Sequence, residues 1–142
     1  MKNSGIPVVI FIFLLSSCSI KPKPITEGVD VCANCKMTIM EKQYAAEILT
    51  KKGRAYIFDD LKCMDQYLLA NNLPKEEIKQ LLVTDFYNPE VLLPADDALF
   101  FYSDELNTPM NGKTVALADS GDLVQIQGEF KGESKPLNEV IQ

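Results

Sequence analysis

The sequence contains no histidine among its 142 residues. This absence removes the commonest nitrogen ligand of metal sites and the usual general base of enzymes. Basic residues are also outnumbered: 14 lysines and arginines stand against 20 aspartates and glutamates, for a net charge of −6. No basic stripe is present to contact phosphates, so nucleic acid is excluded as a partner. We therefore expect the chemistry of this chain to depend on sulfur.

The N-terminal apolar run is too short for a membrane-spanning helix. It covers ten residues, 6–15, whereas a span needs about 20. It follows Lys2 and ends in Leu15-Ser16-Ser17-Cys18, which is similar to a bacterial lipobox. The pattern predicts a signal peptide over 1–17 and a lipid on Cys18, hence anchoring to a bacterial membrane, inner or outer, on the periplasmic side. An ordinary secretory signal with a stray cysteine is the alternative.

Only four cysteines are present, and their number limits the pairing. If Cys18 carries lipid, Cys32, Cys35 and Cys63 remain. An odd number outside the cytoplasm leaves one thiol that stays unpaired or binds something.

The Cys32-x-x-Cys35 pair has four interpretations. A redox dithiol usually opens a helix, and no helix signal begins at Cys35. Structural zinc needs four ligands, which three cysteines supply only with a carboxylate or water. A plain disulfide, between these two or from either to Cys63, is the simplest alternative in an oxidising compartment. The fourth interpretation is a soft-metal site.

The soft-metal interpretation begins with Cys35 and Met37, since in a strand this spacing places both side chains on one face. A thiolate and a thioether suit Cu(I), which accepts two or three ligands. Met110 is the preferred third donor because it lies in a polar turn sequence, Thr108 to Gly112, where a core methionine is unexpected. Secondary metal or redox candidates are Cys32, Cys63 and Met64, although the helical spacing of Met64 favours a core role.

The chain after Cys18 divides into three parts. Residues 18–30 hold two prolines and predict a lipidated flexible tether. Residues 31–94 predict strand, strand, helix and strand, and residues 95–142 predict the same order of elements. Helices and strands mixed in this way indicate the α+β fold class. Asp59 and Asp60 are expected to cap the first helix. The expected strands are 37–40, 44–49, 55–58, 82–87, 98–102 and 113–118; the expected helices are 61–70, 74–81 and a piece of 136–141, with 119–127 either helical or extended.

Taken together, the motifs resemble the NosL family of copper-chaperone lipoproteins. The matching residues are Cys18, Cys32-x-x-Cys35-x-Met37, Phe58-Asp59-Asp60-x-x-Cys63-Met64-x-x-Tyr67 and Pro109-Met110-x-Gly112. Two positions differ from the family pattern. Lys36 replaces a frequent glycine and would place a positive charge near a thiolate, and Asn111 replaces another glycine but tolerates a left-handed turn.

The resemblance implies a fold of two small ββαβ units packed into one compact domain. It implies Cu(I) bound by Cys35, Met37 and Met110, and a carrier rather than an enzyme. It also implies partners, namely nitrous-oxide reductase, whose copper clusters would receive the metal, and its ABC-type assembly complex. The rival from another class is a thiol–disulfide protein that uses Cys32 and Cys35.

Overall fold

The computed structural model describes residues 19–71 and 73–142. The predicted signal peptide over 1–17 and the predicted lipid on Cys18 lie outside the described residues. Within the described part of the chain, no helix is both long enough and apolar enough to cross a membrane.

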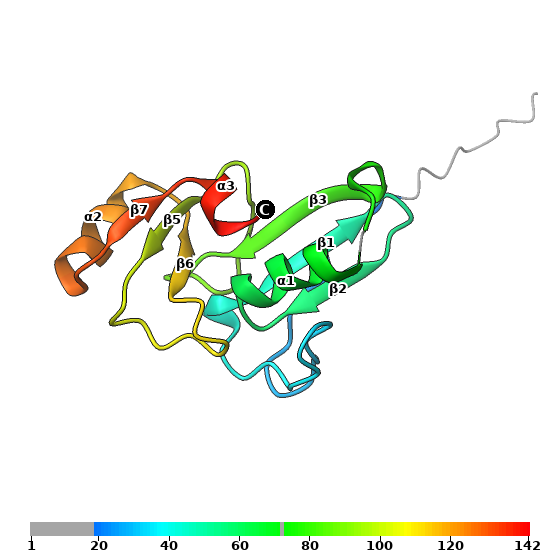
Figure 1. Ribbon diagram of the computed structural model, residues 1–142, viewed down its shortest axis with the longest axis horizontal. Coiled ribbons are helices and arrows are strands. Elements are labelled where there is room, and N and C mark those ends of the chain that lie inside the picture. Colours follow the sequence, from blue (N-terminus) through cyan, green and yellow to red (C-terminus); the bar gives the residue numbers. More distant parts are fainter. Residues whose placement is uncertain (1–18, 72) are drawn as a thin grey trace, which may run out of the picture.

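The first half of the chain forms a four-stranded antiparallel sheet with one helix against it (Figure 1). The strand order is β2-β1-β3-β4, so β1 lies inside the sheet. All five residues of β1 are buried, because β2 and β3 flank its two edges, α1 contacts it, and the segment around Lys23 binds Glu47. The elements are β1 (Ala46–Thr50), β2 (Ala55–Phe58), α1 (Leu61–Asn71), the 3₁₀ turn η2 (Lys75–Glu77), β3 (Ile78–Thr84) and β4 (Leu92–Pro94), preceded by the turn η1 (Lys42–Tyr44).

The second half repeats this plan on a smaller scale. Its sheet order is β6-β5-β7, again antiparallel with the first strand in the centre. Both halves therefore run strand, strand, helix, strand, which confirms the predicted pair of ββαβ units. The elements are β5 (Leu99–Tyr102), β6 (Thr114–Leu117), α2 (Ser120–Glu129), β7 (Glu133–Lys135) and α3 (Leu137–Val140).

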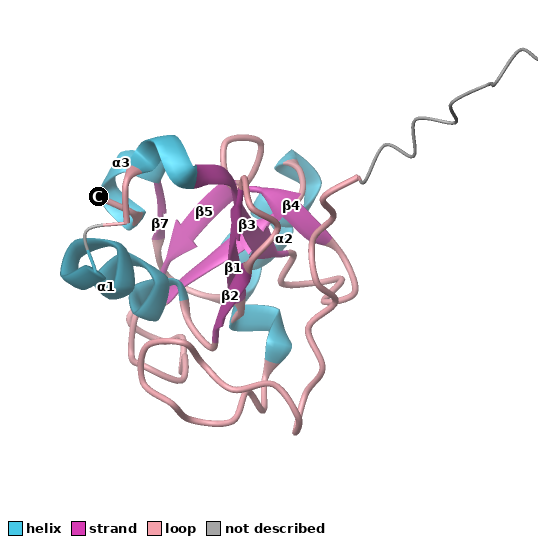
Figure 2. Cartoon of the chain, turned by 90° about the vertical axis from the view of Figure 1, so that its right-hand side faces the viewer, coloured by secondary structure: helices cyan, strands magenta, loops and turns pink. Residues whose placement is uncertain are grey.

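The two units share a core. One apolar cluster joins Phe58 and Val83 of the first unit to Phe100 and Ala116 of the second. A parallel bridge between Asp85 and Ala116 links the sheets through the backbone. Figure 2 shows α1 and α3 on the same side of the strands, and the two helices are in contact. The units consequently form one compact body.

The prediction of a helix over 74–81 is wrong. Only the single turn η2 is helical, and the chain is extended from Ile78 onward. Strand β3 pairs with β1 along its length, from Ile78 opposite Thr50 to Val83 opposite Ala46. These ladder bonds and the burial of Leu82 and Val83 outweigh the helical propensity of the Lys and Glu residues, a tertiary effect that local pattern cannot reveal.

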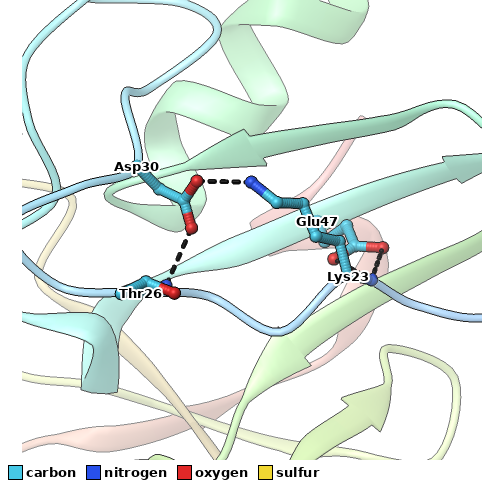
Figure 3. Close-up of polar contacts among 4 residues, drawn as sticks. All are labelled: Lys23, Thr26, Asp30 and Glu47. Carbon is cyan, nitrogen blue, oxygen red and sulfur yellow. Dashed lines mark hydrogen bonds and ion pairs between the residues drawn. The ribbon is translucent and has the colours of Figure 1, made fainter.

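The segment predicted as a tether, 18–30, contacts the first sheet over its described part. Both carboxylate oxygens of the fully buried Glu47 accept from the Lys23 backbone N–H, each at 3.1 Å (Figure 3). The Lys23 ammonium pairs with Asp30, whose carboxylate also accepts from the Thr26 N–H at 2.8 Å. Ile25 packs against a small buried cluster that includes Ile39. This packing fixes the position of the chain where the cysteine loop begins.

Candidate metal site

The cysteine motif lies on a tight loop closed by a backbone ladder. Val31 and Thr38 form an isolated antiparallel bridge, and the Cys32 N–H donates to the Met37 carbonyl at 2.8 Å. The Ala33 N–H donates at 2.7 Å to the carbonyl of Ile57 in β2, which fixes the loop to the sheet. The thiols of Cys32 and Cys35 are therefore placed by a loop rather than by a helix N-terminus. The prediction of a strand over 37–40 is wrong, because only the bridge at Thr38 forms there.

Lys36 completes the turn of this loop in an unusual conformation. Its φ is +67°, in the left-handed region that glycine adopts most easily. Its N–H donates to the Cys32 carbonyl at 3.1 Å, and its ammonium donates to the Ala33 carbonyl. Glycine would adopt this conformation with less strain than lysine does.

The opposite wall of the site is the junction between β2 and α1. Asp60 caps the helix, because its Oδ1 accepts from the Lys62 N–H at 2.8 Å. Asp59 is also buried, but its Oδ2 accepts from the Cys35 thiol at 3.3 Å and its buried Oδ1 has no hydrogen-bond partner. The two predicted caps thus have different roles: Asp60 serves the helix, and Asp59 faces the thiols.

Three thiols and one carboxylate converge at this junction. One ligand atom from each of Cys32, Cys35, Asp59 and Cys63 lies within 4.8 Å of the others. Cys32 and Cys63 are fully buried, while Cys35 is half-buried and so opens the cluster to the surface. All three thiols are free. Sulfur in this density is the donor set of a thiophilic ion such as Cu(I).

Burial keeps the thiols of Cys35 and Cys63 protonated at neutral pH in the absence of metal. Burial raises the pKa of Cys35 to about 11. The hydrogen bond that its thiol donates to Asp59 and its interaction with Cys32 act in the same direction, against a hydrogen bond from the Met37 backbone. Burial likewise raises the pKa of Cys63, although a hydrogen bond from Asn34 opposes it. The positive charge of Lys36, expected near a thiolate, therefore does not offset burial in the metal-free protein.

Met110 reaches the same junction from the second unit. Its N–H donates to Asp60 Oδ2 at 3.0 Å, and the Gly112 N–H donates to the same oxygen at 3.4 Å. The half-buried Met110 side chain packs against the apolar cluster that contains Cys32 and Cys63. Asn111 has a φ of +55°, so the predicted left-handed turn is present.

Gly112 is required by the closeness of this contact. A Cβ at Gly112 would lie 2.4 Å from Asp60 Oδ1 and 3.0 Å from the Lys62 Cβ. Asp60 thus joins the helix start to the methionine loop, while its neighbour Asp59 faces the cysteines. Two adjacent carboxylates hold the two halves of the predicted site next to each other.

The remaining predicted donors differ in exposure. The side chain of Met37 is 56% exposed at the edge of the cysteine loop, and Met64 is fully buried in the core. Cys35, Met37 and Met110 as a ligand set remain a prediction, whereas Met64 occupies the core position that its spacing favoured. The sequence did not identify Asp59 as a member of the thiol cluster. The pair of acids after the strand was a signal for it, because a helix needs only one N-cap residue.

The fold and the site define a class of protein: an α+β domain of paired ββαβ units with a cluster of three thiols and a carboxylate that could hold a metal ion. The family model for NosL matches residues 22–142, so the chain belongs to the NosL family. A solved structure described as the copper chaperone NosL from Shewanella denitrificans has the same fold, with a TM-score of 0.69 and 17% sequence identity, over 87% of this chain and 98% of that one. A search of curated proteins finds no match.

Proposed function

We propose that this protein is a Cu(I) carrier rather than an enzyme, and that it is lipid-anchored through Cys18 to a bacterial membrane on the periplasmic side. The observation that carries the proposal is the convergence of Cys32, Cys35 and Cys63 within 4.8 Å, in a chain of a family whose crystallised member is described as a copper chaperone. By family resemblance, the recipient is nitrous-oxide reductase, with its ABC-type assembly complex as a further partner.

The proposed ligands are Cys35, Met37 and Met110. Cys35 is the half-buried thiol through which the inner cluster reaches the surface. Met37 is exposed and follows it by two residues, and Met110 is held to the same junction through Asp60. A site with one thiolate and two thioethers is easily opened by an incoming sulfur ligand, which a carrier requires if it is to release its cargo.

Two observations weigh against the rival, a thiol–disulfide protein using Cys32 and Cys35. Redox cysteines depend on a lowered pKa, commonly at a helix N-terminus. Here the pair lies in a loop, and burial raises the pKa of Cys35. The metal-free protein therefore presents a poor nucleophile at neutral pH.

An anaerobic Cu(I) titration against a chromophoric chelator tests the proposal. The variants are Cys35→Ser, Met37→Leu and Met110→Leu, and we expect each to bind Cu(I) at least about tenfold more weakly than wild type, equivalent to about 1.4 kcal/mol for a lost donor. Met40→Leu is the matched control, because Met40 is 67% exposed beside the same loop but has no proposed role.

If all three variants bind as tightly as the Met40→Leu control, the proposed ligand set is wrong. If no variant or wild-type protein binds Cu(I) under reducing conditions, the carrier function is wrong as well. Loss of binding on Cys32→Ser or Cys63→Ser alone would instead assign the copper to the inner thiols.

A further inference from the structure

A group of lysines lies at the end of the first sheet that is remote from the thiols. We call it the basic end: Lys21, Lys51, Lys52, Lys75 and Lys79, all exposed. Lys51 and Lys52 form the turn between β1 and β2, and the Lys51 N–H donates at 2.8 Å to the Glu77 carbonyl, beside which η2 and β3 contribute Lys75 and Lys79. The group is therefore continuous in space although it comes from three segments.

The charge of the basic end contrasts with that of the whole chain. The protein carries 20 acidic against 14 basic residues. Among the described residues of the same three segments, Glu76 and Glu77 oppose the five lysines, and Glu77 is paired with Lys52 at 3.3 Å. An excess of positive charge gathered on one end of an acidic protein indicates a surface for an anionic partner.

The path of the chain indicates which partner. Ile20 lies on the basic end: its carbonyl accepts from the Lys79 ammonium at 2.6 Å, and its side chain is 3.7 Å from the position that a Cβ would take on Gly53. Cys18, the residue proposed to carry lipid, precedes Ile20 by two residues. A lipid attached there would bring these lysines within reach of the headgroups.

The opposite end of the same strands carries the metal site. In β1 and β2, Leu49 pairs with Ala55 next to the lysine turn, and Ala46 pairs with Phe58 next to Asp59. Figure 1 shows the β1–β2 turn and the start of α1 at opposite ends of the first sheet. A strand of this length spans roughly 16 Å, so an end resting on the membrane leaves the thiols facing away from it.

We propose that the basic end docks on anionic lipid headgroups and orients the domain, with the metal site directed away from the bilayer. This inference rests on the proposed membrane attachment but not on copper binding. Each lysine near an anionic surface adds a favourable electrostatic contribution to binding. The lipid on Cys18 would hold the chain at the membrane, and the basic end would add the contact that orients the domain.

Lysine acylation read by mass spectrometry tests this with the full chain. The protein is bound to vesicles of phosphatidylcholine alone or with 30% phosphatidylglycerol, recovered by flotation, and treated with an amine-acylating reagent. We expect Lys51, Lys52 and Lys79 to react about fivefold more slowly on the anionic vesicles, the factor that corresponds to about 1 kcal/mol. Lys113 and Lys131 of the second unit are internal controls and should react equally on both.

A paired charge reversal sharpens the test. Lys51→Glu with Lys52→Glu should abolish the slowing at Lys79, whereas Lys131→Glu should leave it, and 0.5 M salt should remove it by shortening the screening length to about 4 Å. Equal acylation on both vesicles, with flotation intact, overturns the docking surface while leaving membrane attachment standing and the basic end available for an acidic protein. Failure to float with either vesicle overturns both. Loss of the slowing in Lys131→Glu overturns the inference by showing an effect of net charge.

Discussion

Asp60 connects the two units at the site, because its carboxylate binds both the start of α1 and the methionine loop. The substitution Asp60→Asn isolates this role. The carboxylate is 1% exposed and accepts from Lys62 on one oxygen and from Met110 and Gly112 on the other. An asparagine has one acceptor oxygen and one NH₂ group. Because asparagine caps helices as well as aspartate does, we expect its oxygen to face Lys62.

The NH₂ group would then face the N–H groups of Met110 and Gly112, which lose their acceptor. Hydrogen bonds to a charged group contribute about 1.5–3 kcal/mol, and an orphaned buried donor costs about 1–3 kcal/mol. The Gly112 bond is long at 3.4 Å and contributes little, so we expect a loss of about 2 kcal/mol in the free energy of unfolding. A loop released by that amount lowers Cu(I) affinity by at most about 30-fold.

Urea unfolding followed by circular dichroism measures the loss of stability, and chelator competition measures the loss of Cu(I) affinity. Asp96→Asn is the matched control, since Asp96 is exposed. Equal stability and equal copper affinity for the two variants would show that the carboxylate does not hold the methionine loop. A stability loss with unchanged affinity would show that Met110 is not a ligand.

Two further predictions concern the cysteine loop. Lys36→Gly should stabilise the protein by about 0.5–1 kcal/mol in urea unfolding, because relief of a left-handed residue, worth roughly 1–2 kcal/mol, exceeds the added freedom of the unfolded chain; a loss of stability would mean that the Lys36 side-chain contact outweighs the strain. The pKa of about 11 for Cys35 predicts that its alkylation in the reduced, metal-free protein rises tenfold per pH unit from pH 7 to 10, because only the thiolate reacts. A rate that levels off near pH 9, the ordinary pKa of a cysteine thiol, would show in peptide mass spectrometry that the pKa is not raised.

Local patterns sufficed for the elements whose signals agree with their environment. The strands at 55–58 and 98–102 combine β-branched or aromatic residues with clear turns, and the helix from Leu61 follows an acidic cap. The order of elements repeats in the two halves, and that repetition carried the fold class. The prediction for 74–81 failed because pairing with β1 decides the conformation of this segment. Ile78 lies opposite Thr50, which precedes it by 28 residues.

The sulfur chemistry of this protein is determined by composition: without histidine, the soft donors are cysteine and methionine, and their spacing indicates the loop around Cys35. Only the tertiary structure decided which groups meet there. Cys63 and Asp59 come to the thiol pair because β2 ends and α1 begins beside the cysteine loop. Met110 arrives from the other unit because one buried carboxylate, Asp60, binds its backbone. These contacts join residues 24 to 52 positions apart, and only folding against a common core brings such distant segments together.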